Sequence, residues 1–394
     1  MNTPPCWPRY LFLLLLGPLG SEAHWPRHTI DGSSQGADGV RLADVNGDGQ
    51  LDVTTGWEEG GLIRIYLHPG PDLAKQPWPV LTVGRVRSPE DAVFIDLNGD
   101  QRMDVVSSCE GKTKSIYVHW APPSLQDYTN EAAWRTNVVP STQSKEAWMF
   151  ALPWSQGPDR PDSLIVGSKG ANASVSQLQI PEMGRPLEAW RLRRLYEAGW
   201  IMSLRSFDLD NDGDLDILVS DRKGPNKGVL WLENPVTPST NEWKEHRIGA
   251  DNQEVMFLDV TSAGKTQSQV QVAVFAKPAT IFLFTRLDAL SPRWQTKTYP
   301  IQAHIGTAKA VRLVDINQDD QLDIVATCEH ATEGRSGVFW FPLPNRPTQT
   351  IQQVQDISGP EGIKFDRIEL ADLDQDGDLD VITCEENKNL GVIW

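Results

Sequence analysis

A nine-residue acidic stretch occurs five times along the chain, and it constrains the fold more than any other feature. Its last copy, Asp-Leu-Asp-Gln-Asp-Gly-Asp-Leu-Asp, spans residues 372–380, and close copies begin at Asp44, Asp96, Asp208 and Asp315. Carboxylates this close repel one another unless a cation lies between them, and Ca²⁺ accepts about 6–8 oxygen ligands. The repeat therefore predicts up to five Ca²⁺ ions with a structural role.

The predicted metal ligands are the side-chain oxygens at positions 1, 3, 5 and 9 of each loop. They are Asp44, Asn46, Asp48, Asp52, Asp96, Asn98, Asp100, Asp104, Asp208, Asp210, Asp212, Asp216, Asp315, Asn317, Asp319, Asp323, Asp372, Asp374, Asp376 and Asp380.

An EF-hand is the main alternative for such loops, and the sequence argues against it. An EF-hand needs a bidentate Glu at position 12 and a helix on each side. Position 12 is here Thr55, Ser107, Val219, Ala326 or Thr383. The flanks, such as residues 93–95 and 217–219, are short apolar runs rich in β-branched residues, which predict strands. Each loop is therefore expected to join two strands.

Composition and charge are those of a globular protein that does not bind nucleic acid. The 394 residues are 39% hydrophobic and carry a formal net charge of −17. Five bound Ca²⁺ would neutralise much of this charge. A nucleic-acid-binding surface would need a basic run or a basic and aromatic stripe, and neither occurs.

The first residues have the pattern of an export signal. Arg9 precedes an apolar run at residues 11–16, and Ser21 and Ala23 are small residues suited to a cleavage site. We expect residues 1–23 to be a signal peptide and residues 24–394 to form one secreted or periplasmic domain. No segment approaches the ~20 apolar residues of a membrane span.

Three cysteines follow the predicted cleavage site: Cys109, Cys328 and Cys384. Their odd number and irregular spacing argue against a disulfide framework. We interpret them as small buried residues, with a Cys328–Cys384 bridge or a reactive thiol as the alternative.

Tryptophans mark a second, longer repeat. Trp25, Trp78, Trp134, Trp190, Trp243 and Trp294 lie 51 to 56 residues apart, and each begins a predicted short strand with an apolar residue five positions on. A repeat of about 50 residues with four short strands predicts propeller blades. The acidic loop is intact in units 1, 2, 4, 6 and 7 and degenerate in units 3 and 5.

The two ends of the chain predict how the ring closes. The sequence stops at Trp394 on the third strand of the last unit, whereas residues 25–30 form a spare strand at the start. Pairing these two segments would leave no open sheet edge. We therefore predict an all-β, seven-bladed propeller with four-stranded blades, closed by its N-terminal strand.

The loops and their flanking strands resemble the FG-GAP/VCBS repeat family over residues 25–394. The resemblance implies a seven-bladed propeller whose blades carry calcium loops. Gln101 and Asp320 depart from the family pattern because they replace the glycine at position 6, which favours positive φ, so these two sites are expected to be strained or weaker. A weaker resemblance is to the propeller part of aldos-2-ulose/anhydrofructose dehydratases. The other domains of those enzymes are not recognised, and no catalytic residue is transferred.

The strand ends opposite the calcium loops form what we call the upper face. The residue six positions after the last loop ligand, or its counterpart, marks each second strand's tip: Glu58, Glu110, Lys169, Arg222, Lys277, Glu329 and Glu386 or its neighbour Glu385. Blades 6, 7, 1 and 2 thus present acids and blades 3, 4 and 5 present bases. This predicts an upper face with an acidic half and a basic half, or, as the alternative, a rim of salt bridges.

Two sets of upper-face residues are the candidates for function. The catalytic candidates are Glu110, Lys169, Arg222, Lys277, Glu329 and His330. The ligand-binding candidates are Glu58, Asp91, Trp148, Trp200, Glu254, Lys309, Arg367 and Glu386. Packing in the channel is the alternative for both tryptophans, and a solvated loop position is the alternative for His330.

Three functions remain open at this point. The first is a module that binds a carbohydrate or an extracellular protein on the upper face. The second is a sugar lyase or dehydratase with a Glu or His base and Lys or Arg stabilising an enolate. The third is an architectural adhesion propeller. We expect a monomer.

Overall fold

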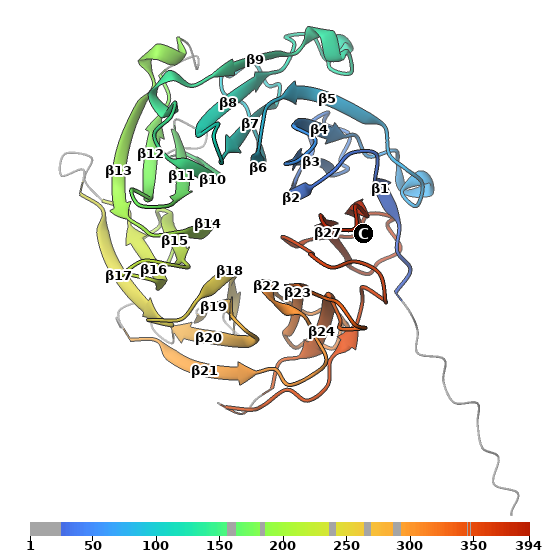
Figure 1. Cartoon of the computed structure of the whole chain (residues 1–394), viewed down its shortest axis with the longest axis vertical. Helices are drawn as coiled ribbons and strands as arrows, with labels where there is room; N and C mark the ends of the chain where they lie inside the picture. Colours follow the sequence, from blue (N-terminus) through green and yellow to red (C-terminus); the bar gives the residue numbers. More distant parts are fainter. Residues whose placement is uncertain are drawn as a thin grey trace, which may run out of the picture.

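The chain folds into a ring of small antiparallel sheets around a central axis (Figure 1). The computed structural model describes residues 25–155, 163–181, 186–235, 242–263, 269–286, 293–344, 346 and 348–394. Within these residues, seven four-stranded sheets follow one another around the ring. The predicted seven-bladed β-propeller is therefore confirmed.

The blades repeat one order, from an inner strand through a second and third strand to an outer strand. Blade 1 consists of β2 (Ala37–Ala43), β3 (Asp52–Trp57), β4 (Leu62–Tyr66) and β5 (Val80–Arg85). Blade 2 consists of β6 (Pro89–Ile95), β7 (Asp104–Cys109), β8 (Ser115–Trp120) and β9 (Arg135–Val138). Blade 3 consists of β10 (Ala147–Trp154), β11 (Ser163–Lys169), β12 (Ser174–Gln179) and β13 (Arg191–Glu197).

The second half of the ring follows the same order. Blade 4 consists of β14 (Ile201–Phe207), β15 (Asp216–Asp221), β16 (Gly228–Glu233) and β17 (Lys244–Gly249). Blade 5 consists of β18 (Val255–Ala263), β19 (Gln269–Ala276), β20 (Thr280–Arg286) and β21 (Gln295–Pro300). Blade 6 consists of β22 (Thr307–Val314), β23 (Asp323–Glu329), β24 (Val338–Pro342) and β25 (Gln355–Asp356). Blade 7 consists of β26 (Glu369–Ala371), β27 (Asp380–Glu385), β28 (Gly391–Ile393) and β1 (Thr29–Asp31).

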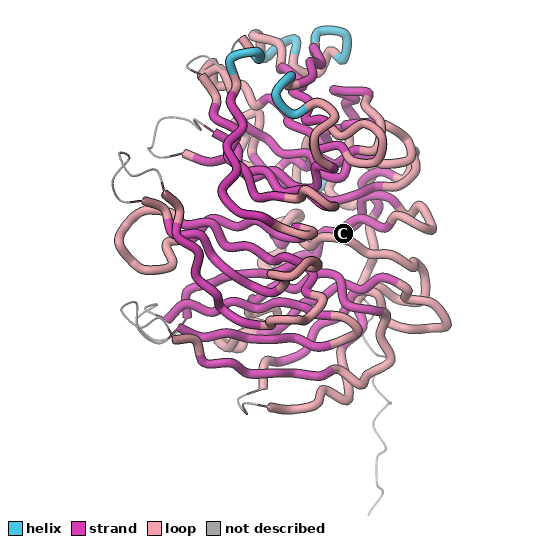
Figure 2. Tube along the Cα trace, turned by 60° about the vertical axis from the view of Figure 1, so that its left-hand side comes forward, coloured by secondary structure: helices cyan, strands magenta, loops and turns pink. Residues whose placement is uncertain are grey.

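In the part of the chain that the structure describes, helical structure is limited to short 3-10 turns in connectors at one side of the ring (Figure 2). They are η1 (Pro71–Leu73), η2 (Leu125–Asp127), η3 (Glu131–Ala133), η4 (Pro140–Thr142) and η6 (Leu187–Ala189). No helix in the described residues is long and apolar enough to cross a membrane.

The N-terminal strand completes the last blade, as predicted. β1 pairs antiparallel with β28, with Thr29 opposite Ile393. His28 and Trp394 exchange two backbone hydrogen bonds of 2.8 and 3.0 Å. The first and last strands of the described chain therefore close the ring.

The repeated tryptophans lie just before the outer strands and pack between blades. Trp134 and Trp190 directly precede β9 and β13, and Trp78 lies two residues before β5. Trp78 shares a buried cluster with Tyr66 of blade 1 and Val392 of blade 7. The 51-to-56-residue repeat thus reflects one buried tryptophan at each place where these neighbouring blades meet.

The inner strands carry a bulge at a matching position in several blades. The residues skipped by the register are Glu90 in β6, Met149 in β10, Met202 in β14 and Lys309 in β22. A bulge leaves one residue unpaired and redirects its side chain. The bulges in blades 2, 4 and 6 all occur six residues before the first Asp of the loop, so the same slot of the channel wall is rebuilt in each blade.

Aromatic side chains fill the channel on the side of blades 3 to 5. Phe150 of β10 and Phe257 of β18 meet edge to face with ring centroids 5.2 Å apart, although their blades are not neighbours in the ring. The buried side chains of Met149, Met202 and Met256 belong to the same cluster. Apolar side chains of blades 3, 4 and 5 therefore pack together at the channel.

The cysteines agree with their first interpretation. Cys109, Cys328 and Cys384 are free and buried, so the alternative Cys328–Cys384 bridge is wrong. The predicted signal peptide, most of the proline-rich turn of blade 3 and part of the degenerate loop of blade 5 lie outside the described residues.

Candidate functional site

In each loop-bearing blade the inner and second strands form a hairpin around the acidic loop, and one residue from each strand lies at the upper face. One lies six residues before the first loop ligand and the other six residues after the last. The pairs are Asp38 and Glu58, Glu90 and Glu110, Met202 and Arg222, Lys309 and Glu329, and Asp366 and Glu386. Since the two strands are antiparallel, each pair lies at one end of its hairpin. We call the ring of these ends the mouth of the channel.

The basic residues of the mouth are paired with carboxylates across blade boundaries. Lys169 of blade 3 forms an ion pair with Glu110 of blade 2. The Nε of Arg222 in blade 4 donates to Glu254 of blade 5 at 2.7 Å. Lys277 of blade 5 contacts Glu329 of blade 6. The salt-bridge alternative therefore describes this rim, and these bases are not free to orient an anionic ligand.

Two further lysines of the mouth are paired in the same way. Lys309 Nζ lies 3.0 Å from a carboxylate oxygen of Asp366, and Lys364 contacts Glu386. Lys309 and Asp366 come from neighbouring blades, whereas Lys364 and Glu386 both come from the last blade. The pairs neutralise most of the charge of this part of the rim.

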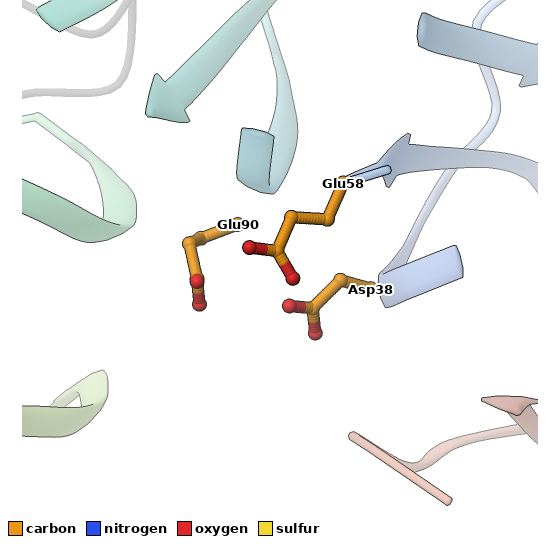
Figure 3. A group of neighbouring side chains, drawn as sticks. All are labelled: Asp38, Glu58 and Glu90. Carbon is orange, nitrogen blue, oxygen red and sulfur yellow. The ribbon is translucent and has the colours of Figure 1, made fainter. Parts of the chain in front are cut away.

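Three carboxylates converge at the mouth, and among the described residues their one ion pair is a long one, from Lys169 Nζ to Glu90 at 3.7 Å. Asp38, Glu58 and Glu90 point toward one another from blades 1 and 2 (Figure 3). One oxygen from each lies within 4.8 Å of the others. Asp38 is only 6% exposed, and no N–H group in the described residues donates to its side chain. The mouth therefore carries a local surplus of negative charge and of hydrogen-bond acceptors.

Burial and mutual repulsion raise the pKa values of these acids. Burial, then the carboxylates of Asp366 and Glu90, raise the pKa of Asp38 well above its usual value. Burial, then Glu110 and Glu386, raise the pKa of Glu58 to about 7. Burial also raises the pKa of Glu90, against the attraction of Lys169. A positively charged or hydrogen-bond-donating ligand would relieve this repulsion.

Three of the predicted ligand-binding residues are not at the upper face. Trp148 is fully buried, and its Nε1 donates to the carbonyl of Thr142 at 3.1 Å, so it is packing and not a sugar platform. Asp91 and Arg367 are also buried and take part in ion pairs deeper in the channel. The sequence prediction was wrong here because it treated strand starts as exposed, whereas these three side chains are buried inside the fold.

Trp200 and His330 do lie at the upper face. Cations of Lys169, Arg222 and Lys223 lie 4.4 to 4.6 Å from the ring centroid of Trp200, so its indole already serves as a platform for protein cations. The side chain of His330 is 68% exposed, with Nδ1 2.8 Å from the hydroxyl of Thr307. His330 therefore has the solvated position that was its alternative.

The acidic loops share one backbone-to-carboxylate framework. In loop 1, Asp44 accepts from the backbone N–H groups of Gly47 and Gly49 at 2.7 and 2.9 Å. Asp52 accepts from the N–H of Val45 at 2.9 Å and from that of His68 at 2.8 Å. The final Asp thus also ties the loop to the third strand. Equivalent bonds recur at Asp104, Asp216 and Asp380.

Loops 4 and 7 differ from the others because every odd position is Asp. In loops 1, 2 and 6 the Asn at position 3 is 2.9 to 3.4 Å from the Asp at position 5 and donates to it. In loop 4, one oxygen each of Asp208, Asp210 and Asp214 is buried without a hydrogen-bond partner. Carboxylate oxygens of Asp208, Asp210 and Asp216 also lie within 4.8 Å of one another. Orphaned acceptors at this spacing fit a hard cation such as Ca²⁺.

The two non-glycine residues at position 6 have the predicted backbone geometry. Gln101 and Asp320 both have φ of 62°, in the left-handed region where Gly49, Gly213 and Gly377 lie in the other loops. Their backbone N–H groups still donate to the first Asp of the loop, at 2.9 and 2.8 Å. The loop therefore keeps its shape at the cost of local strain.

Sequence reasoning missed Asp38 and Lys364 at the mouth. Asp38 had a usable signal, because it occupies the same slot, six residues before the loop, as Glu90, Lys309 and Asp366. Lys364 lies in the connector before β26, and no repeated spacing in the sequence marks this position. Its place at the mouth follows only from its contact with Glu386.

The described fold defines the class of this protein as a seven-bladed β-propeller. Within that class, a scan against protein-family models matches the FG-GAP-like repeat at residues 44–107 and 315–383, so the chain carries FG-GAP-like repeats in two regions. No curated protein matches the sequence.

Solved structures with other sequences share the architecture. A crystal structure of BBS1N in complex with ARL6DN, soaked with mercury, aligns with a TM-score of 0.54 at 11% identity, over 93% of this chain and 94% of that one. A lead-soaked crystal of the same complex gives 0.53 at 11% identity, over 95% and 96%. An Agrocybe aegerita lectin, described as recognising non-reducing terminal N-acetylglucosamine, gives 0.41 at 13% identity, over 67% and 66%. At 11% identity the likeness to BBS1N shows the fold alone.

Proposed function

We propose that this chain is an exported, calcium-stabilised binding propeller whose mouth recognises a carbohydrate through amine and hydroxyl groups. The observation that carries the proposal is the set of Asp38, Glu58 and Glu90, three converging carboxylates. Among the described residues their one ion pair is the 3.7 Å contact of Glu90 with Lys169, a base that Glu110 already holds. The proposal differs from the expected charge-divided site, because the bases of blades 3 to 5 are already paired with acids.

Calcium has a supporting role in this proposal. The loops join the inner and second strands at the end of each hairpin opposite the mouth. Ions bound there would neutralise the loop carboxylates and fix the turn between the two strands that carry the mouth residues. The buried, unpartnered oxygens of Asp208, Asp210 and Asp214 support such an ion in blade 4.

The charge of the mouth decides which carbohydrate class fits. Carboxylates accept hydrogen bonds from hydroxyl groups and form stronger, charge-assisted bonds with ammonium groups. A uronic acid would instead bring a like charge against Glu58 and Glu90. We therefore expect oligosaccharides with free amino groups to bind best, neutral ones less well, and uronic acids least.

Isothermal titration calorimetry with matched oligosaccharides tests the proposal. The full chain, in constant Ca²⁺, is titrated with glucosamine oligomers, their N-acetylated forms and galacturonic acid oligomers of equal length. Glu58→Gln should weaken binding of the amino sugar by about tenfold, the order expected for one charge-assisted hydrogen bond. Glu188→Gln, an exposed acid beside the outer strand of blade 3, is the matched control and should bind normally. Uronic acid binding at least as tight as amino sugar binding would contradict the proposal.

A further inference from the structure

A second group of charges lies deeper in the channel than the mouth. Three arginines and one glutamate occupy a slot three residues before the first loop Asp in blades 1, 4, 6 and 7, which places them at one level of the channel. Together with their ion-pair partners they form what we call the arginine belt: Arg41, Asp91, Arg205, Asp259, Arg312, Arg367 and Glu369.

Two arginines of the belt are well paired. Arg41 donates from Nε and Nη2 to the two carboxylate oxygens of Asp91, at 2.9 and 2.7 Å. Arg312 donates to Asp259 at 3.0 Å and also contacts Glu369. Arg41 and Arg312 alone therefore contact all three carboxylates of the belt.

The other two arginines share carboxylates that Arg312 already holds. Arg205 approaches Asp259 only to 3.7 Å, and its buried Nε has no hydrogen-bond partner. Arg367 is 4% exposed and donates from Nε to Glu369 at 3.0 Å. Within the described residues, no hydrogen bond from the Nη atoms of Arg367 is present. The belt thus has donors to spare between blades 4 and 7.

The charge count of the belt leaves one positive charge uncompensated, since four guanidinium groups face three carboxylates. Burial lowers the pKa of Arg205 to about 10, and the positive charges of Arg312 and Arg41 act in the same direction. Burial, then Arg41 and Arg205, lower the pKa of Arg367 to about 9. Burying an unpaired charge is costly, and proteins normally provide a counter-ion. The side chain of Arg205 retains 23% exposure, so it is not sealed from solvent.

We propose that the arginine belt binds one small oxyanion between Arg205 and Arg367, at the level below the mouth. The ligand class is a tetrahedral inorganic oxyanion or a carboxylate group, because the forked N–H donors of guanidinium match paired oxygen acceptors. The site is separate from the acidic mouth and does not depend on the carbohydrate proposal.

Thermal unfolding of the full chain at constant Ca²⁺ and low millimolar salt tests this site. Sodium sulfate and sodium acetate are the probes, and they separate a tetrahedral oxyanion from a carboxylate. For the wild type we expect the Tm to rise and saturate with at least one of the two anions. Arg205→Gln leaves three arginines against three carboxylates, so this variant should have a higher Tm than the wild type without added anion and should lose the anion-dependent rise.

Two further variants keep the result interpretable. Arg205→Lys retains the charge and should keep part of the anion response even if its Tm changes. Arg135→Gln removes an exposed charge on the outer strand β9 and should respond to both anions as the wild type does. The proposal is overturned if neither anion gives a saturable rise in the wild type, or if Arg205→Gln responds as strongly as the wild type.

Discussion

Lys75, in the connector between β4 and β5 of blade 1, forms an ion pair with Asp374 in the acidic loop of blade 7, with Nζ 2.5 Å from Oδ2. The contact spans the junction where the ring closes. It also places a protein cation on a carboxylate that we propose as a Ca²⁺ ligand. We therefore expect the lysine to compete with an ion at the proposed site in loop 7 and to tether the two blades when that ion is absent.

Replacing this lysine separates the two effects. Lys75→Met should bind Ca²⁺ more tightly in loop 7, because the competing charge is gone, and should have a lower Tm than the wild type in chelator. Calorimetric Ca²⁺ titration and thermal unfolding in EGTA measure the two quantities. Lys112→Met, at an exposed lysine in the turn between β7 and β8, is the control and should leave Ca²⁺ binding unchanged. Weaker Ca²⁺ binding in Lys75→Met would argue against competition.

Glu58 gives the mouth a pH dependence of stability. Its pKa is raised by burial, then by neighbouring carboxylates, to about 7 from an ordinary 4.5. Between these values the folded state holds the proton more tightly than the unfolded state, so this group makes stability fall as pH rises. Glu58→Gln should therefore raise the Tm at pH 8 and have little effect at pH 5.

Thermal unfolding of Glu58→Gln across this range checks the sign. The difference in Tm from the wild type should grow between pH 5 and pH 8 and then level off. A difference that is constant with pH, or that shrinks as pH rises, would show that Glu58 does not titrate in this window.

Gln101 has a strained, left-handed backbone conformation. With φ at 62° in a slot that other loops give to glycine, Gln101→Gly relieves strain but adds entropy to the unfolded chain. We expect a net gain of about 0.5 kcal/mol in the free energy of unfolding. Urea denaturation measures it. Arg87→Gly, an exposed loop residue outside the left-handed region, should lose stability instead. Equal losses in both variants would mean that the strain is negligible.

The architecture could be predicted from the sequence because each repeat corresponds to one blade. The loop spacing located most inner and second strands, and the tryptophans located most outer strands. The pairing of β1 with β28 followed from counting strands at the two ends. The outer strand of blade 6 had no such marker, and β25 covers only Gln355–Asp356. That blade lacks the tryptophan that anchors the others.

The mouth was less predictable because it depends on contacts between blades. The spacing gave the correct hairpin tips, such as Glu110 and Lys169, but no single-blade pattern shows that these two residues pair. Burial inside the fold had a larger effect. Trp148 packs between blades 2 and 3, and Asp91 and Arg367 form ion pairs in the channel, so none of the three is at the surface.

The most direct test of this account is the Tm of the full chain with and without a calcium chelator. Each occupied site should add about 2.7 kcal/mol at a Ca²⁺ concentration 100 times its Kd. We predict that EGTA lowers the Tm, that added Ca²⁺ restores it, and that Mg²⁺ at the same concentration restores it less. An unchanged Tm in EGTA would contradict the proposal that calcium holds the hairpins carrying the mouth.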